Sequence, residues 1–189
     1  VMANKLSETG DSVLLLEAGG SDMNPWVQMP IGYGKVYYDK RVNWKYTTEP
    51  VPGLNGQRSY WPRGKVLGGS SSINAMVYVR GHPQDYAEWN AVAPGWGWDD
   101  IEPVFRRMEN WDGPQSDARG VGGPLAVHDV TDEVHPLTRT YLEGAAQADI
   151  PTNRDYNGPH MEGACCYQIT TKGGYRASAS RSYLKPARK

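Results

Sequence analysis

The chain has 189 residues, with 20 lysines and arginines against 21 aspartates and glutamates, which leaves a net charge of −1. This length suits one domain or two small ones, and the balanced charge argues against nucleic acid as a partner. The longest apolar run, Val13–Leu16, is far too short to cross a bilayer, so we expect no transmembrane segment.

The first twenty residues predict a helix, a turn and a buried strand. Met2 and Leu6 have the spacing of a helix tail, and Gly10 is a suitable stop. Residues 12–18 form a continuous apolar run closed by Glu17, as in a buried parallel strand. In dinucleotide-binding units an acid at the end of the second strand accepts hydrogen bonds from a ribose, a role that Glu17 fits; a surface acid is the alternative. Because no G-x-G-x-x-G precedes this strand, we expect the chain to be part of a longer protein.

Residues 21–62 are irregular and rich in aromatic side chains. Residues 43–49 alternate like an exposed-edge strand, and the turn residues at 52–56 predict a hairpin that returns through Tyr60 and Trp61. These aromatics either wall a site or fill a half-buried sheet.

The stretch from Arg63 to Gly81 is the most informative part of the sequence. Gly64, Gly68 and Gly69 allow a ligand to approach the backbone closely. Three serines follow, and the spacing of the apolar residues at 73, 76 and 77 predicts a helix that begins near Ser72. A glycine-rich turn before a helix N-terminus binds anions such as a cofactor phosphate, or is simply a turn before a core helix.

The rest of the chain alternates short helices and strands. The patterns predict helices over 85–89 and 101–108, the latter capped by Asp99, a loop over 110–123, and a helix that starts at Pro136. They also predict strands over 123–130 and 162–171 and a turn at Gly173-Gly174.

The cysteines and histidines carry no recognisable chemistry. Cys165 and Cys166 are adjacent, so ordinary disulfide geometry does not join them; free thiols favour a reducing compartment. The four histidines show no ligand spacing, so we expect no metal site, and no G-x-S-x-G elbow supports hydrolase chemistry.

The stretch from Gly64 through Gly68-Gly69-Ser70-Ser71 and Ile73-Asn74 to Ala87 resembles a signature of the glucose-methanol-choline (GMC) flavin oxidoreductases. The amino-acid sequence of residues 60–72 is most similar to that of choline dehydrogenases and related bacterial alcohol dehydrogenases. The resemblance extends over essentially the whole chain. It implies an α/β fold, α+β overall, with part of a Rossmann-like FAD-binding domain in residues 1–110. Residues 111–189 would begin a substrate-binding domain with an antiparallel sheet.

The resemblance also implies a cofactor site. The residues expected to bind FAD are Glu17, Arg63, Gly64, Leu67, Gly68, Gly69, Ser70, Asn74, Ala75, Met76 and Val77. FAD should be bound non-covalently, because Ile73 stands where some relatives carry a tethering histidine. The family's catalytic histidine lies far toward the C-terminus, and no position here matches it, so no catalytic residue is assigned.

The implied function is oxidation of a small alcohol, choline-like or another primary alcohol, by hydride transfer to FAD. A lyase or photodecarboxylase of the same fold would share these motifs, and a binding or structural role for the fragment is the other alternative. The other partners would be the remaining segments of the same protein, without which we expect this chain to be inactive. We expect a cytoplasmic location, with peripheral membrane association as the alternative.

Overall fold

The structure is a computed structural model that describes residues 1–188. Its contacts divide the chain into two compact units: unit 1 holds residues 1–76 and 171–189, and unit 2 holds residues 77–170. This division differs from the expected boundary at 110/111, and the functions expected for those two ranges stay predictions. No helix within residues 1–188 is both long and apolar enough to span a membrane.

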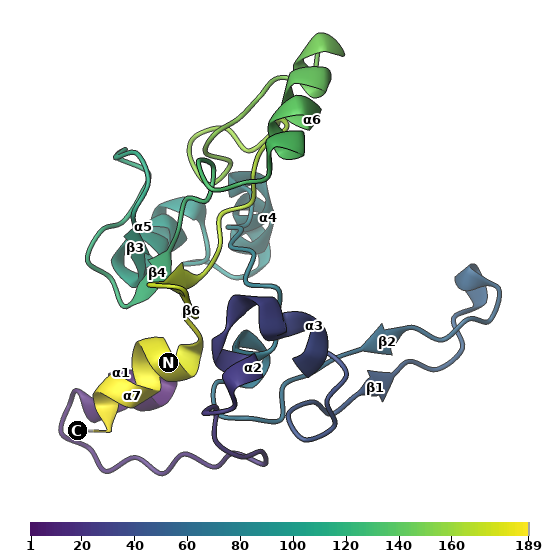
Figure 1. The fold of residues 1–189 in the computed structure, drawn as a ribbon. Coiled ribbons are helices and arrows are strands. Elements are labelled where there is room, and N and C mark those ends of the chain that lie inside the picture. The colour runs from purple at the N-terminus through teal and green to yellow at the C-terminus, as the bar shows by residue number, and fades with distance from the viewer. Residues whose placement is uncertain (189) are drawn as a thin grey trace. The chain divides into compact units, whose positions relative to one another are not determined.

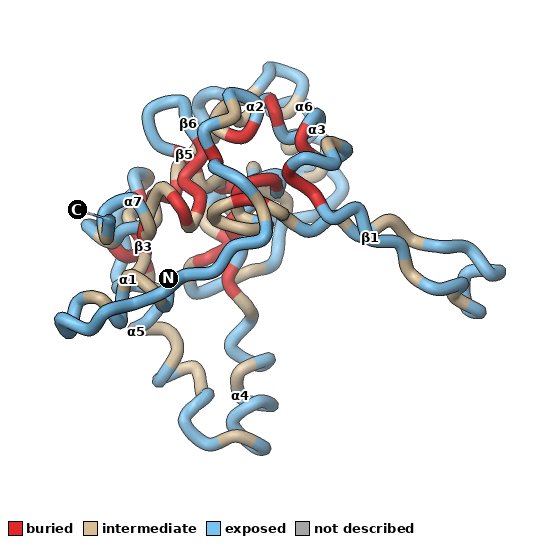
Figure 2. The backbone as a smooth tube through the Cα atoms, turned by 90° about the horizontal axis from the view of Figure 1, so that it is seen from below, coloured by how far each residue is buried: buried red, intermediate tan, exposed pale blue. Residues whose placement is uncertain are grey.

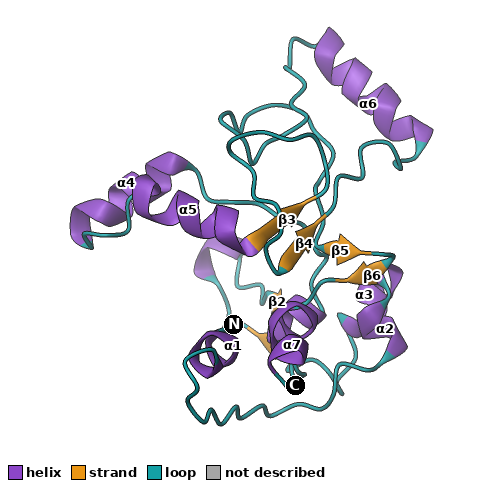
Figure 3. Cartoon of the chain, turned by 90° about the vertical axis from the view of Figure 1, so that its left-hand side faces the viewer, coloured by secondary structure: helices purple, strands orange, loops and turns teal. Residues whose placement is uncertain are grey.

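Unit 1 consists of short elements joined by long loops (Figure 1; loops are teal in Figure 3). Its elements are α1 (Met2–Ser7), α2 (Pro25–Gln28), the 3-10 helix η1 (Pro30–Gly32), α3 (Tyr33–Val36), β1 (Tyr46–Thr47), the 3-10 helix η2 (Pro52–Leu54), β2 (Tyr60–Trp61), the 3-10 helix η3 (Gly69–Ser72), β5 (Thr171–Lys172), β6 (Tyr175–Arg176), the π-helix η4 (Ser180–Leu184) and α7 (Lys185–Ala187).

Two antiparallel hairpins of unit 1 follow from local turn chemistry. Strands β1 and β2 pair with Tyr46 opposite Trp61, which confirms the predicted hairpin, and Figure 1 shows it reaching away from α2 and α3. Strands β5 and β6 pair across Gly173 and Gly174, whose φ angles of +57° and +77° only glycine adopts readily.

The predicted buried strand over residues 12–18 is wrong. This segment has no regular structure, and its leucines are exposed, with Leu14 at 82% and Leu16 at 83% (the segment after α1 is pale blue in Figure 2). A strand needs a neighbour to satisfy its backbone, and the pairing found is one parallel bridge from Gly20 to Val66. The apolar pattern indicates what could be buried, but it does not supply a partner.

Unit 2 contains three α-helices and a two-stranded parallel sheet. Its elements are α4 (Pro83–Val92), α5 (Trp98–Met108), β3 (Glu109–Trp111), β4 (Leu125–Val127) and α6 (Pro136–Gln147). The three predicted helices are confirmed, and both α4 and α6 begin with proline after a histidine N-cap. Helix α5 is capped at Gly97 rather than Asp99, and its apolar side chain Val104 is 43% exposed. Of the predicted strand over 162–171, Thr171 belongs to β5, and Ala164 and Ile169 form isolated bridges.

The interior of unit 2 is built around a buried carboxylate. Glu109 is 0% exposed and accepts hydrogen bonds from Arg80 Nη2 at 2.5 Å, from the Arg119 guanidinium, and from the Gly120 amide at 2.9 Å. Arg119 also reaches Asp155 at 2.6 Å and lies 3.8 Å over the Trp111 ring. A buried charge is tolerated when it is paired and hydrogen-bonded, and Glu109 meets both conditions.

Candidate functional site

The glycine-rich stretch of unit 1 closes on itself as a tight loop. The Gly64 amide donates to Ser70 Oγ at 3.1 Å, and the Gly69 amide donates to the Val66 carbonyl at 2.8 Å. A Cβ on Gly64 would lie 2.2 Å from the Gly69 carbonyl, so that position has room only for glycine. At Gly68 a φ of +91° imposes the same requirement through backbone conformation.

Apolar side chains hold both ends of this loop. Val66 and Ile73, which flank the two central glycines, belong to the buried cluster Val27, Val36, Val42, Val66 and Ile73. Burial of each such side chain contributes about 1.5–3 kcal/mol, which offsets the entropy lost by an ordered glycine loop. The loop therefore has a rigid base.

The predicted helix from Ser72 through Val77 is wrong. Only the four-residue η3 forms, and the chain then leaves helical geometry at Ile73, with φ −130°, and at Met76, with φ +65°. Side chains compete with the helix: Ser72 Oγ donates to the Leu67 carbonyl at 2.7 Å, and Asn74 Oδ1 accepts from the Met76 amide at 3.0 Å. A helix dipole at Ser72 therefore makes no contribution to the site.

A pocket of about 390 Å³ in unit 1 brings together four of the expected cofactor residues: Glu17, Leu67, Gly68 and Gly69. This volume falls within the range of small-molecule sites and suits part of a dinucleotide. The first four residues of the chain complete the wall of this pocket, together with Ala179, which precedes η4, and Ser180 and Leu184 of η4.

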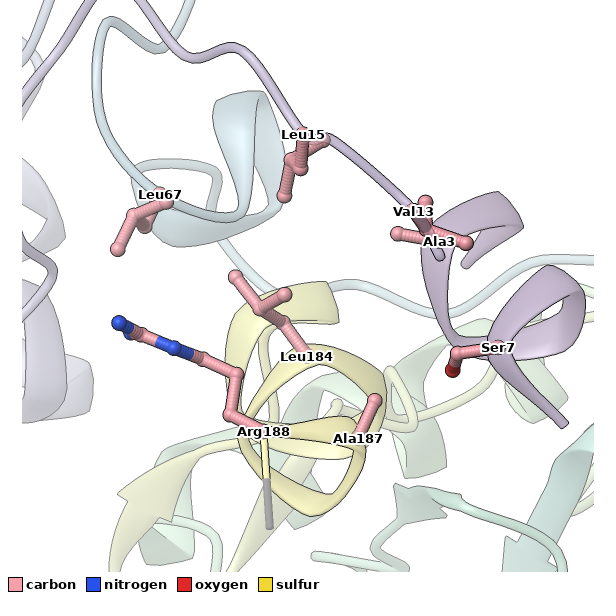
Figure 4. A pocket seen from close by; sticks show the side chains of 8 residues that line it. All are labelled: Ala3, Ser7, Val13, Leu15, Leu67, Leu184, Ala187 and Arg188. Carbon is pink, nitrogen blue, oxygen red and sulfur yellow. The ribbon is translucent and has the colours of Figure 1, made fainter. Parts of the chain in front are cut away.

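A second pocket of about 430 Å³ shares Leu15, Leu67 and Leu184 with the first. Figure 4 shows these three leucines directed into a common space, with the Arg188 side chain extended beside Leu67. The two pockets therefore form one mainly apolar region with polar groups at Glu17, Ser180 and Arg188.

The Glu17 side chain is held by the backbone two residues further along the chain. Its Oε1 accepts from the Gly19 amide at 2.8 Å, and its side chain is exposed. A Cβ on Gly19 would lie 1.9 Å from the Lys65 carbonyl, so close packing of Gly19 fixes Glu17 beside the glycine loop. The second carboxylate oxygen has no partner among residues 1–188 and can accept a hydrogen bond from a ligand hydroxyl.

The other expected cofactor residues lie outside both pockets. Arg63 is exposed, and its guanidinium donates to the Pro62 carbonyl at 2.8 Å and lies 5.2 Å from the Trp61 ring. Asn74 and Ala75 are exposed, Met76 is buried, and Val77 belongs to unit 2. Gly64 and Ser70 shape the loop rather than line the pockets.

Sequence reasoning missed Ser180. It is 1% exposed, it lines the first pocket, and its Oγ has no hydrogen-bond partner among the described residues. A buried hydroxyl without a partner costs about 1–3 kcal/mol, which a polar ligand atom can recover. The donors and acceptors of the pocket therefore fit the hydroxyls and phosphate oxygens of a dinucleotide such as FAD. A sequence signal existed in the serines at 178, 180 and 182, but serine spacing alone has no specific meaning.

The two cysteines and His128 of unit 2 are not poised as a nucleophile or a base. Burial raises the pKa of both Cys165 and Cys166, which are free thiols, and keeps them protonated. Partial burial lowers the pKa of His128, but hydrogen bonds to Asp112 and Glu133 outweigh it and raise the pKa overall. Both ring nitrogens of His128 are engaged, at 2.5 Å and 2.9 Å.

Comparisons with known proteins identify the family of this chain. Residues 8–189 match the GMC oxidoreductase family. The chain is 47% identical over 190 residues to oxygen-dependent choline dehydrogenase of Rhizobium etli, covering 100% of this chain and 34% of that protein. It is 44% identical to alcohol dehydrogenase [acceptor] of Pseudomonas putida, covering 97% of this chain and 34% of that protein.

A solved structure gives the same result for the fold. Pyridoxine 4-oxidase from Mesorbium loti superposes with a TM-score of 0.91 at 36% identity, covering 98% of this chain and 37% of that one. The mixed α and β fold class is thereby confirmed, and the chain spans about a third of the length of the curated relatives it matches, at 34%. The match over residues 8–189 confirms the resemblance carried by the glycine-rich stretch, and the chain belongs to the GMC oxidoreductase family.

Proposed function

We propose that the complete protein carrying this chain binds FAD without a covalent link and oxidises a small alcohol to the aldehyde. The observation that carries the proposal is the shared pocket of Glu17, Gly68 and Gly69, whose wall includes the Ser180 hydroxyl, unpartnered within residues 1–188. Family membership supports the same reading. The relatives named choline dehydrogenase and alcohol dehydrogenase support a choline-like or other primary alcohol as substrate.

FAD, when bound, supplies a hydride acceptor for the alcohol carbon. This chain's residues orient that cofactor. Glu17 would accept hydrogen bonds from ribose hydroxyls, Gly68 and Gly69 would let the loop backbone come close, and the exposed Arg63 would offset negative charge. Residues Asn74–Val77 would line the flavin, and the proton acceptor for the alcohol is not assigned within this chain.

The direct test is release of the cofactor. The complete protein should be yellow and should lose FAD to the supernatant on acid precipitation, because Ile73 offers no nucleophile for a covalent link. Bleaching of the flavin by added alcohols under anaerobic conditions would separate an oxidoreductase from a lyase of the same fold. A protein that retains NAD(P) and no flavin would contradict the proposal.

A second prediction concerns Glu17. In the complete protein, Glu17→Gln should weaken FAD binding by about 1.5–3 kcal/mol, the scale of a hydrogen bond to a charged group. Turnover at saturating FAD should change little, because a ribose contact is remote from the hydride. The measurement is FAD titration of the apoprotein, with Glu8→Gln, a change at an exposed acid, as the matched control. Equal FAD affinities for both variants would show that Glu17 is a surface acid with no contact to the cofactor.

A further inference from the structure

Arg176 is a buried cation that has no counter-ion among residues 1–188. It lies in β6, its side chain is 1% exposed, and its Nη2 has no hydrogen-bond partner among the described residues. Burial lowers the pKa of Arg176 to about 10. The two buried arginines of unit 2, Arg80 and Arg119, are by contrast both paired with Glu109.

The guanidinium binds backbone instead. Nε donates to the Val27 carbonyl at 2.9 Å, and Nη1 donates to the Asn74 carbonyl at 2.7 Å and to Asn74 Oδ1 at 2.8 Å. A longer contact of 3.3 Å reaches the Ser71 carbonyl. Arg176 thus ties the segment that follows the glycine-rich loop to helix α2.

Asn74 passes this constraint on to Met76. The same Oδ1 that accepts from Arg176 also accepts from the Met76 amide at 3.0 Å, and Met76 has a φ of +65°. A residue other than glycine in this region costs about 1–3 kcal/mol and persists only where its surroundings enforce it. Asn74 and Ala75 are exposed, and the Arg176 and Met76 hydrogen bonds to Asn74 restrict the backbone at this point.

The missing counter-ion points to an electrostatic role as well. Carbonyl dipoles satisfy most of the guanidinium donors, but they leave its full charge in place. An isolated buried charge is normally neutralised by a partner, so a site that retains one favours a ligand of opposite charge.

We propose that Arg176 is a positioning residue of the cofactor site, which fixes residues 71–76 and biases the bound flavin toward its reduced, more negatively charged state. The electrostatic part of this inference rests on the proposed function, because the ligand is the flavin. The positioning part rests on the hydrogen bonds of Arg176 within unit 1.

The sharpest variant is Asn74→Asp in the complete flavoprotein. Both protons received by Asn74 Oδ1 come from N–H donors, so a carboxylate can accept them without rearrangement. The variant gives Arg176 a counter-ion while the guanidinium stays in place. We expect the flavin reduction potential to fall by about 30 mV, a tenfold change in the equilibrium constant for a two-electron couple.

Two substitutions of Arg176 separate charge from geometry. Arg176→Gln should lower the flavin reduction potential similarly and should speed hydrogen exchange of residues 71–76. Arg176→Lys should keep the reduction potential but still speed exchange of this segment, because one ammonium group cannot replace the several N–H donors of the planar guanidinium. The control is Arg58→Gln, which removes a half-exposed charge in a surface pair with Glu49 and should change neither quantity.

The outcomes distinguish the two proposals. A wild-type protein without flavin overturns the proposed function and the electrostatic half of this inference, while hydrogen exchange of residues 71–76 in Arg176→Gln still decides the positioning half. A flavoprotein whose Asn74→Asp variant keeps the wild-type potential overturns the electrostatic role. If Arg176→Gln and Arg58→Gln exchange alike over residues 71–76, the positioning role is overturned.

Discussion

Replacing Glu109 by glutamine is expected to destabilise unit 2 by about 3–5 kcal/mol, the usual cost of removing one partner from a buried ion pair. The carboxylate faces two guanidinium groups and an amide, all donors, and its side chain is 0% exposed. Glutamine would remove the charge and bring two N–H donors toward Arg80 and Arg119. Hydrogen exchange at the amides of unit 2, measured in the complete protein, reports the change in the free energy of opening.

The matched control is Glu49→Gln. Glu49 pairs with Arg58 at 3.3 Å and is 89% exposed, and exposed ion pairs contribute roughly 0–1 kcal/mol. Similar exchange rates in the Glu49 and Glu109 variants would show that the buried network does not hold unit 2 together.

Gly64→Ala should disrupt the glycine-rich loop. The added Cβ would stand 2.2 Å from the Gly69 carbonyl and 2.6 Å from the Ser70 nitrogen, so backbone has to move. Overpacking of this kind costs roughly 3 kcal/mol. If the loop contacts FAD, its displacement should weaken FAD binding by about a hundredfold, as measured by titration of the apoprotein.

Gly20→Ala is the companion substitution. Gly20 is exposed, pairs with Val66 beside the same loop, and has open space around the position of a Cβ. The FAD affinity of the Gly20→Ala variant should therefore stay near that of the wild type. Equal losses in both variants would mean that FAD affinity does not depend on the packing of Gly64.

Local signals in the sequence were sufficient for the elements that local chemistry controls. Pro83 and Pro136 mark the first turns of α4 and α6, and the turn at Pro52–Leu54 joins β1 to β2 as expected. The strand predicted over residues 12–18 is wrong because its apolar pattern indicates only that these side chains could be buried. A strand also needs a neighbouring strand to pair its backbone groups, and the described residues do not supply one.

Other features depend on contacts that sequence spacing does not reveal. The helix predicted from Ser72 does not form because the side chains of Ser72 and Asn74 hydrogen-bond to nearby backbone groups. The spacing of apolar residues does not reveal these hydrogen bonds. Of the expected site residues, Glu17, Leu67, Gly68 and Gly69 meet in one pocket. Arg176 and Glu109 were missed because charged residues are usually exposed, and their partners lie far away along the chain.

The discontinuity of unit 1 has a consequence for biosynthesis. Residues 77–170 form unit 2 as one uninterrupted segment, whereas Arg176 meets Val27 across 149 residues. A ribosome adds the intervening segment in on the order of ten seconds, while the first part of unit 1 waits without β6. During that interval Val27, Ser71 and Asn74 lack the guanidinium that joins them, so the contacts that fix the segment after the glycine-rich loop form only once β6 has emerged.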